Sequence, residues 1–236
     1  MILAVNTAEE ALQLLLARDG AVLESVTEFC QGRMNEVMAP TAQAMIARHG
    51  GAVTAVACVR GPGSFTGVRL GLAFCHGLCL GRGLPMAGID YLPLLAASAP
   101  DAGGAEVHVV THSRRGQVYH QGFGPSGASK ASDIDAGKAR EIVAARSLEA
   151  DVVVLGTGLR RNPEAFADLG RARRLDVESP SPEALLAAAL AASYAPPPVE
   201  ALYLRGSDAE ENLAVIAAGR GLSEEEARER MKRAMA

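Results

Sequence analysis

Residues 59–71 read Val59-Arg60-Gly61-Pro62-Gly63-Ser64-Phe65-Thr66-Gly67-Val68-Arg69-Leu70-Gly71. The apolar run that precedes this stretch predicts a buried strand, and the apolar pattern that follows it predicts a helix. The glycines between them let the backbone take positive φ and approach another group closely. The sequence therefore predicts a strand, a tight glycine-rich turn, and a helix whose unpaired N-terminal N–H groups face the turn.

Three functions are compatible with such a turn: binding of a phosphate or nucleotide at the helix N-terminus, nucleophilic catalysis by Ser64, or presentation of a helix to a partner. A nucleophile elbow requires glycine two residues before and two after the serine, where this chain has Pro62 and Thr66, so catalysis by Ser64 is excluded. The dinucleotide fingerprint matches only in part, because Gly67 comes one place late. Asp90 follows at about the distance of a ribose-binding acid, which keeps a nucleotide site open.

The same turn resembles the signature of the bacterial TsaB (YeaZ) family. Three further landmarks support the resemblance, which extends over most of the chain: the opening strand and turn 1–7, the triplet 156–158, and the segment 202–205. The signature turn consists of Gly61, Pro62, Gly63, Ser64, Phe65, Thr66 and Gly67.

The resemblance implies an α/β fold of the actin-like ATPase (actin/Hsp70/sugar-kinase) type, with two lobes that each contain a mixed sheet flanked by helices. It implies a non-catalytic subunit that binds and activates TsaD for formation of N6-threonylcarbamoyladenosine (t6A) at position 37 of tRNAs reading codons that begin with A. TsaE, an accessory ATPase, and the tRNA would be engaged only through the TsaB–TsaD complex, and a homodimer is possible. The alternative is a nucleotide-dependent phosphotransferase that uses the signature turn.

Composition is that of an ordinary globular protein: 236 residues, 49% hydrophobic and 21% charged, with a formal net charge of −4. The acidic balance argues against autonomous tRNA binding, which usually shows a basic footprint. We expect a cytoplasmic protein, because no signal peptide and no apolar run long enough for a membrane span is evident. The four cysteines have no framework spacing, so we expect them to be reduced and to bind no metal: Cys30, Cys58, Cys75 and Cys79.

Turn residues over 99–104 predict a boundary between an N-terminal lobe (1–104) and a reduced C-terminal lobe (105–206), followed by a helical extension (207–236). In the first lobe we expect strands 2–6, 11–17, 21–28, 53–60 and 84–89, and helices 33–49, 67–82 and 90–98. In the second we expect strands 107–111, 117–123, 151–155 and 172–177, helices 138–149, 163–169 and 182–193, and a loop over 124–137. In the extension we expect helices 208–218 and 223–235, with a capping box at Ser223 and Glu226.

No catalytic, cofactor-binding or metal-binding residue is predicted. In ATP-using relatives of this fold an acidic residue ends the first strand, whereas this chain has the neutral Asn6 there. The corresponding turn of the second lobe has His112. Since hard cations prefer carboxylate oxygens, neither position suits a metal–nucleotide site.

Two helices offer candidates for a partner surface. Helix 33–49 places methionines on one stripe, which normally marks a face packed on the chain's own core but also suits an adaptable contact surface. Helix 67–82 carries a line of small residues that permits close helix packing. The family resemblance implies that the two helices build a four-helix bundle with TsaD or with a second copy, which favours the partner interpretation. The candidates are Met34, Met38, Met45, Arg69, Gly71 and Phe74.

Overall fold

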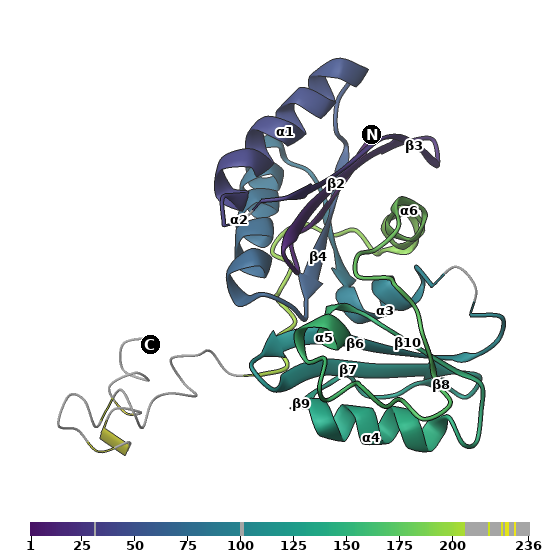
Figure 1. Cartoon of the computed structure of the whole chain (residues 1–236). Coiled ribbons are helices and arrows are strands. Elements are labelled where there is room, and N and C mark those ends of the chain that lie inside the picture. The colour runs from purple at the N-terminus through teal and green to yellow at the C-terminus, as the bar shows by residue number, and fades with distance from the viewer. Residues whose placement is uncertain are drawn as a thin grey trace. The chain divides into compact units, whose positions relative to one another are not determined.

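A computed structural model describes residues 1–30, 32–99, 102–205, 217, 223, 225, 226 and 229. The chain divides into two units, Met1–Leu202 and Tyr203–Ala236. All named strands and helices belong to the first unit, which contains two β-sheets with helices packed on them (Figure 1).

The first sheet has the strand order β3-β2-β1-β4-β5. Its strands are β1 (Ile2–Asn6), β2 (Ala11–Arg18), β3 (Ala21–Phe29), β4 (Ala55–Gly61) and β5 (Met86–Asp90). The first three are antiparallel, and β4 and β5 continue the sheet in parallel with β1. Asp19 and Gly20, which join β2 to β3, have φ of 54° and 78°, as a tight hairpin turn requires.

The second sheet has the order β11-β10-β6-β7-β8, and β9 pairs with β7. Its strands are β6 (Glu106–Arg114), β7 (Gln117–Gly124), β8 (Gly127–Ala128), β9 (Ser132–Asp135), β10 (Val152–Leu155) and β11 (Arg173–Arg174). The pair β6–β7 is antiparallel, whereas β10 runs parallel to β6. Both sheets are thus mixed, as predicted.

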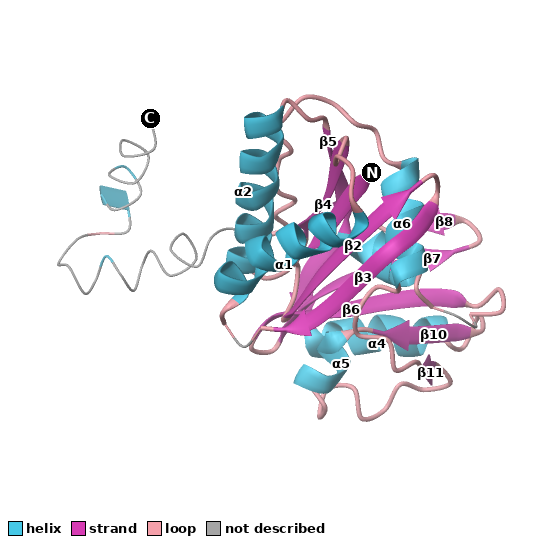
Figure 2. Ribbon diagram, turned by 90° about the horizontal axis from the view of Figure 1, so that it is seen from above, coloured by secondary structure: helices cyan, strands magenta, loops and turns pink. Residues whose placement is uncertain are grey.

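Helices cover both faces of the first sheet (Figures 1 and 2). The helices of the chain are α1 (Met34–His49), α2 (Phe65–Arg82), α3 (Tyr91–Ala96), α4 (Ala136–Arg146), α5 (Thr157–Arg161) and α6 (Pro182–Ala191). On the first sheet, α1 packs against β2 and α2 against β4, while α6 contacts β1, β2 and β3. Because both its faces are covered, β2 is buried from Ala11 to Ala17, and this explains its nearly continuous apolar sequence.

Helix α3 contacts strands of both sheets, β4 and β5 in the first and β6 and β7 in the second. Its Leu92 and Leu95 are fully buried. On the second sheet α4 packs against β7, β9 and β10, over a core that includes Val143 and Val154. The two sheets are therefore joined by a shared apolar helix.

The chain returns to the first sheet after the second is complete. Helix α6 packs there, Ala195 pairs with Met86 of β5, and the Leu202 N–H donates to the Arg60 carbonyl (2.8 Å). The predicted boundary between residues 104 and 105 separates the strands of the two sheets. The residues after it, however, pack partly on the second sheet and partly on the first. Local sequence patterns could not indicate this return, because it depends on contacts between segments more than 100 residues apart.

Three predicted elements of the second half are wrong. The helix expected over 163–169 is a series of turns, and the helix begins instead at Thr157, directly after Gly156. The expected strand 172–177 is reduced to the two residues of β11. The expected loop 124–137 contains β8 and β9, because the edge of β7 that does not pair with β6 accepts further strands despite a sequence rich in glycine and serine.

Most of the predicted extension 207–236 lies outside the described residues. The capping box is confirmed: the Glu226 N–H donates to Ser223 Oγ (3.2 Å), and the Ser223 N–H donates to Glu226 Oε2 (2.8 Å).

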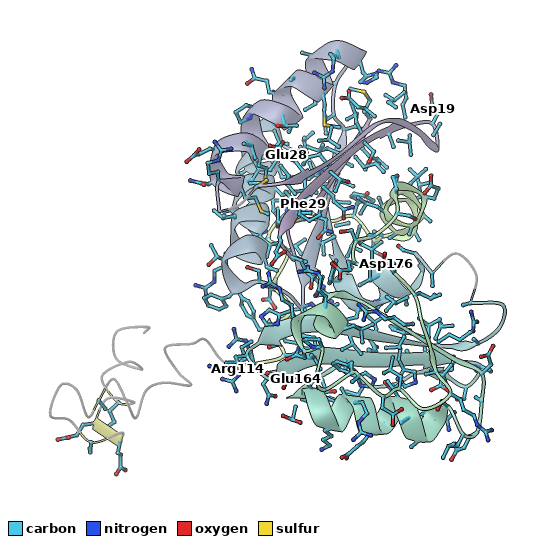
Figure 3. All side chains as sticks on the ribbon, viewed as in Figure 1. Asp19, Glu28, Phe29, Arg114, Glu164 and Asp176 are labelled. Atoms are coloured by element: carbon cyan, nitrogen blue, oxygen red, sulfur yellow. The ribbon has the colours of Figure 1, made fainter. Side chains whose placement is uncertain are left out.

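The described part of the chain contains no helix with both the length and the apolar character needed to cross a membrane. Figure 3 shows the side chains, among them the exposed Phe29 at the end of β3.

Candidate functional site

The signature turn packs directly on the turn between β1 and β2. The Ser64 N–H donates to the Ala8 carbonyl (2.6 Å), and Ser64 Oγ accepts from the Gly67 N–H (3.2 Å) as the N-cap of α2. A Cβ at Gly63 would overlap the Ala8 carbonyl, and one at Gly67 would overlap the Thr7 carbonyl. The close approach of two backbone segments thus explains these glycines without a bound phosphate.

Gly71 has the same role one turn further along α2. It is buried, and a Cβ there would overlap the Thr7 hydroxyl. The expectation that Gly71 lies on a partner surface is therefore corrected: it brings α2 close to the end of β1 within the chain.

The methionine stripe of α1 also faces the chain's own core. Met34, Met38 and Met45 have exposed fractions of only 7%, 4% and 0%. These side chains pack beneath α1, which contacts β2, so they are unavailable to a partner in this structure. Their placement on a partner surface is corrected too, because the apolar side of an amphipathic helix is buried first by the nearest sheet.

A groove remains on the outer side of α1 and α2. It has a volume of about 430 Å³, and Phe74 and Leu78 of α2 and Ile46 of α1 give it an apolar lining. Gln43 and Arg82, both exposed, supply polar groups. We call this feature the α1–α2 groove. Of the predicted interface residues it includes Phe74.

Arg69 is exposed on α2, where its guanidinium lies 3.6 Å from the centre of the Phe65 ring. This geometry is a cation–π contact between two residues of the signature region. Arg69 thus stays at the surface beside the turn, and it does not line the α1–α2 groove.

The two residues that the sequence analysis singled out lie on strands of different sheets, Asn6 at the end of β1 and His112 in β6. Asn6 is buried, donates to Gln13 Oε1 (2.7 Å) and accepts from the Ala8 N–H (3.0 Å), so its amide serves the β1–β2 turn. The His112 N–H donates to Thr157 Oγ1 (3.0 Å), which ties β6 to the start of α5.

Glu9, in the turn between β1 and β2, is a residue that sequence reasoning missed. Its carboxyl group accepts from Thr157 Oγ1 (2.6 Å) and from the Tyr91 hydroxyl (3.2 Å). Burial raises the pKa of Glu9 to about 7, although both hydrogen bonds act in the opposite direction. Its sequence context, Thr7-Ala8-Glu9-Glu10, reads as a surface turn, and no local signal distinguishes Glu9 from Glu10.

A family model described as "TsaD: tRNA N6-adenosine threonylcarbamoyltransferase" matches residues 28–139. The "tRNA threonylcarbamoyladenosine biosynthesis protein TsaB" of Escherichia coli (strain K12) is 35% identical over 178 residues, which cover 72% of this chain and 75% of that protein. The chain belongs to the TsaB family.

A TsaB protein of Bacillus subtilis (strain 168) is 26% identical over 50% of this chain and 52% of its own length. Among solved structures, YeaZ from Pseudomonas aeruginosa has a TM-score of 0.67 at 25% identity, covering 80% of this chain and 89% of that one. A second Pseudomonas aeruginosa structure, titled an uncharacterized protein with similarity to peptidase YEAZ, has a TM-score of 0.69 at 23% identity, with coverage of 86% and 99%. The predicted family and fold class are confirmed.

Within this TsaB chain the four cysteines are free and buried. Burial raises the pKa of the Cys75 thiol well above its usual range, which disfavours the thiolate that binds metals. Among the residues that the structure describes, no group of three or more His, Cys, Asp or Glu side chains could hold a metal ion. That the protein binds no metal stays a prediction.

Alanine substitutions at two glycines of α2 should have opposite effects on the free energy of unfolding. Gly67→Ala must displace the Thr7 backbone and should lower the free energy of unfolding by about 1–3 kcal/mol. Gly77→Ala is the matched control, because its Cβ would meet nothing within 4 Å and alanine favours a helix by up to about 1 kcal/mol over glycine. Urea unfolding measures both. Equal effects would contradict the packing role of Gly67.

Glu9 predicts a pH dependence of stability. Its pKa is about 7 when folded, against a usual 4.5, so the folded chain keeps a proton that the unfolded chain releases between these values. The free energy of unfolding should therefore fall as pH rises from about 4.5 to about 7, and then level off. Glu9→Gln, which stays neutral, should reduce this fall in urea unfolding at several pH values.

The matched control for that measurement is Glu164→Gln, which removes a carboxylate from an exposed position (Figure 3). It should leave the slope of stability against pH between 4.5 and 7 unchanged. If Glu9→Gln and Glu164→Gln have the same pH profile as the unmodified chain, Glu9 does not retain a proton in the folded state.

Proposed function

We propose that this protein is an accessory subunit of the machinery that forms t6A on tRNA, and that it binds and activates TsaD. The t6A role is supported by the TsaB relative that shares 35% identity over 72% of the chain. The observation that carries the partner role is the α1–α2 groove, an apolar depression between two helices at the surface. Amphipathic helices of partners bind in such grooves.

The groove suits a helix of TsaD for two reasons. Its apolar floor around Phe74 and Leu78 is flanked by polar side chains, the usual arrangement of a protein interface. On the same helix Gly77 and Gly81 have open space where a Cβ would be, so a second helix could approach the backbone of α2 closely. TsaE and tRNA would then be engaged through the resulting complex, and the same surface could support a homodimer when TsaD is absent.

We infer that the chain does not catalyse the reaction itself. Asn6 and His112 occupy the positions where carboxylates would hold a metal and phosphates. The amide of Asn6 is engaged by Gln13 and Ala8, and the glycines of the signature turn are required for packing. The Glu9 carboxyl group faces two hydroxyl groups and has a raised pKa, so it is a poor ligand for a hard cation.

The partner role predicts that Phe74→Glu weakens binding to the TsaD of the same organism about tenfold or more, because it places a charge in the apolar centre of the interface. The formation of t6A in the reconstituted reaction should fall in parallel. Isothermal titration calorimetry and a tRNA modification assay measure the two effects, and circular dichroism checks that the variant folds.

Leu80→Glu is the matched control: it introduces the same charge on α2 but at a side chain that is 72% exposed and outside the groove. It should bind TsaD normally. If Phe74→Glu folds and binds as tightly as Leu80→Glu, TsaD docks elsewhere. Met38→Glu and Gly71→Leu do not test the surface, because both residues are buried and their substitution should destabilise the chain itself.

The alternative function, a nucleotide-dependent phosphotransferase, is tested on the isolated protein. We expect no ATP hydrolysis above that of a buffer control with magnesium, because the carboxylates that organise metal and phosphate are replaced. ATP turnover that depends on metal and disappears in Ser64→Ala or Gly63→Ala variants that still fold would contradict the accessory role.

A further inference from the structure

A second pocket lies on the other sheet and shares no residue with the α1–α2 groove. It has a volume of about 510 Å³, within the usual range of about 300–1,000 Å³ for small-molecule sites. Strands β6 and β7, helix α4 and the segment from β8 to β9 supply its lining. Neither the TsaB resemblance nor the partner surface accounts for the polar groups in it.

Two histidines and a carboxylate form a hydrogen-bonded chain in this pocket. Glu106 Oε1 lies 2.9 Å from His108 Nε2, and His108 Nδ1 lies 2.9 Å from His120 Nε2. The imidazole rings stack with their centres 5.2 Å apart and an angle of 26° between their planes. Both histidines are at least nine-tenths buried, with exposed fractions of 2% and 5%.

The proton positions in this chain follow from the charges around it. The Arg146 guanidinium, 2.7 Å from Glu106 Oε2, lowers the pKa of that carboxyl group and keeps it ionised. Glu106 can then only accept, so His108 donates through Nε2. Burial lowers the pKa of His108, so its Nδ1 carries no proton and accepts from His120 Nε2.

The remaining ring nitrogen, Nδ1 of His120, is then a hydrogen-bond acceptor. The pKa of His120 is lowered to about 4, mainly by burial and to a smaller extent by the neighbouring His108, so the ring is neutral at pH 7. Within the described residues this nitrogen makes no hydrogen bond. It is also not sealed from solvent. The wall of the pocket therefore offers a lone pair to a donor group of a ligand.

A lysine supplies a positive charge at the rim of the pocket. Lys130 lines the pocket, is exposed, and forms no ion pair with the residues described. The charge of Arg146, by contrast, is balanced by Glu106 and Glu149. Ser126 and Ser132 add hydroxyl groups to the lining. The pocket thus combines one acceptor inside with one free cation at its edge.

We propose that this pocket binds a small hydroxylated anion, with a hydroxyl group of the ligand donating to His120 Nδ1 and its phosphate or carboxylate beside Lys130. The two recognition elements are different in kind, so a ligand needs both a hydroxyl donor and a negative charge to bind well. This site lies on the second sheet and is independent of TsaD binding through the α1–α2 groove.

The test uses sn-glycerol 3-phosphate as the probe, with glycerol and inorganic phosphate as its two halves. Long-range proton–nitrogen NMR spectra of the histidine rings report on binding at Nδ1 of His120. We expect glycerol 3-phosphate to shift the His120 and His108 ring signals in a saturable way, and to bind at least tenfold more tightly than glycerol or phosphate alone.

Lys130→Gln and Lys138→Gln separate a built site from general charge attraction. Both remove one exposed lysine, but only Lys130 lines the pocket. Lys130→Gln should weaken the binding of glycerol 3-phosphate about tenfold, the size of a lost charge-assisted contact, and Lys138→Gln should leave it unchanged. The proposal is overturned if the histidine signals do not respond, if phosphate alone binds equally well, or if both variants weaken binding equally.

Discussion

The contact between the turn after β1 and the turn after β4 determines where α2 packs on the first sheet. The turn after β4 lies against the turn after β1 so closely that Gly63 and Gly67 have no room for a Cβ. This contact fixes the start of α2, which Ser64 caps, and thereby the direction in which α2 runs beside α1. The α1–α2 groove exists because α2 is held there, so a signature that resembles a phosphate loop acts here as a packing element.

The same turn after β1 also carries a contact between the two halves of the first unit. Thr7 and Ala8 support α2, and Glu9, the next residue, meets Thr157 and Tyr91 from the other side. Asn6 and His112 stand where a metal–nucleotide site would need carboxylates, and the Glu9 carboxyl group has a pKa raised by burial. The hydrogen bonds of Glu9 to Thr157 and Tyr91 tie the turn after β1 to α5 and α3.

The second sheet carries its polar groups in a different place. Glu106, His108 and His120 come from adjacent antiparallel strands, where the register places His108 opposite Gly122 and leaves space for its ring. Arg146 of α4 keeps Glu106 ionised, and the ionised carboxylate fixes the direction of the hydrogen bonds through the two rings. The proposed partner surface and the proposed small-molecule pocket thus lie on different sheets of the chain.

The sequence by itself determined the family, the mixed sheets, the strand–turn–helix at residues 55–82 and the hairpin at Asp19-Gly20, because these depend on local periodicity and on turn residues. Only the tertiary structure decided which side of α1 and α2 is free. An apolar stripe has the same period whether it faces a sheet or a partner, and Met34, Met38 and Met45 face the sheet. Glu9 and the pair His108–His120 also required the fold, since their partners come from segments that only the packed sheets bring together.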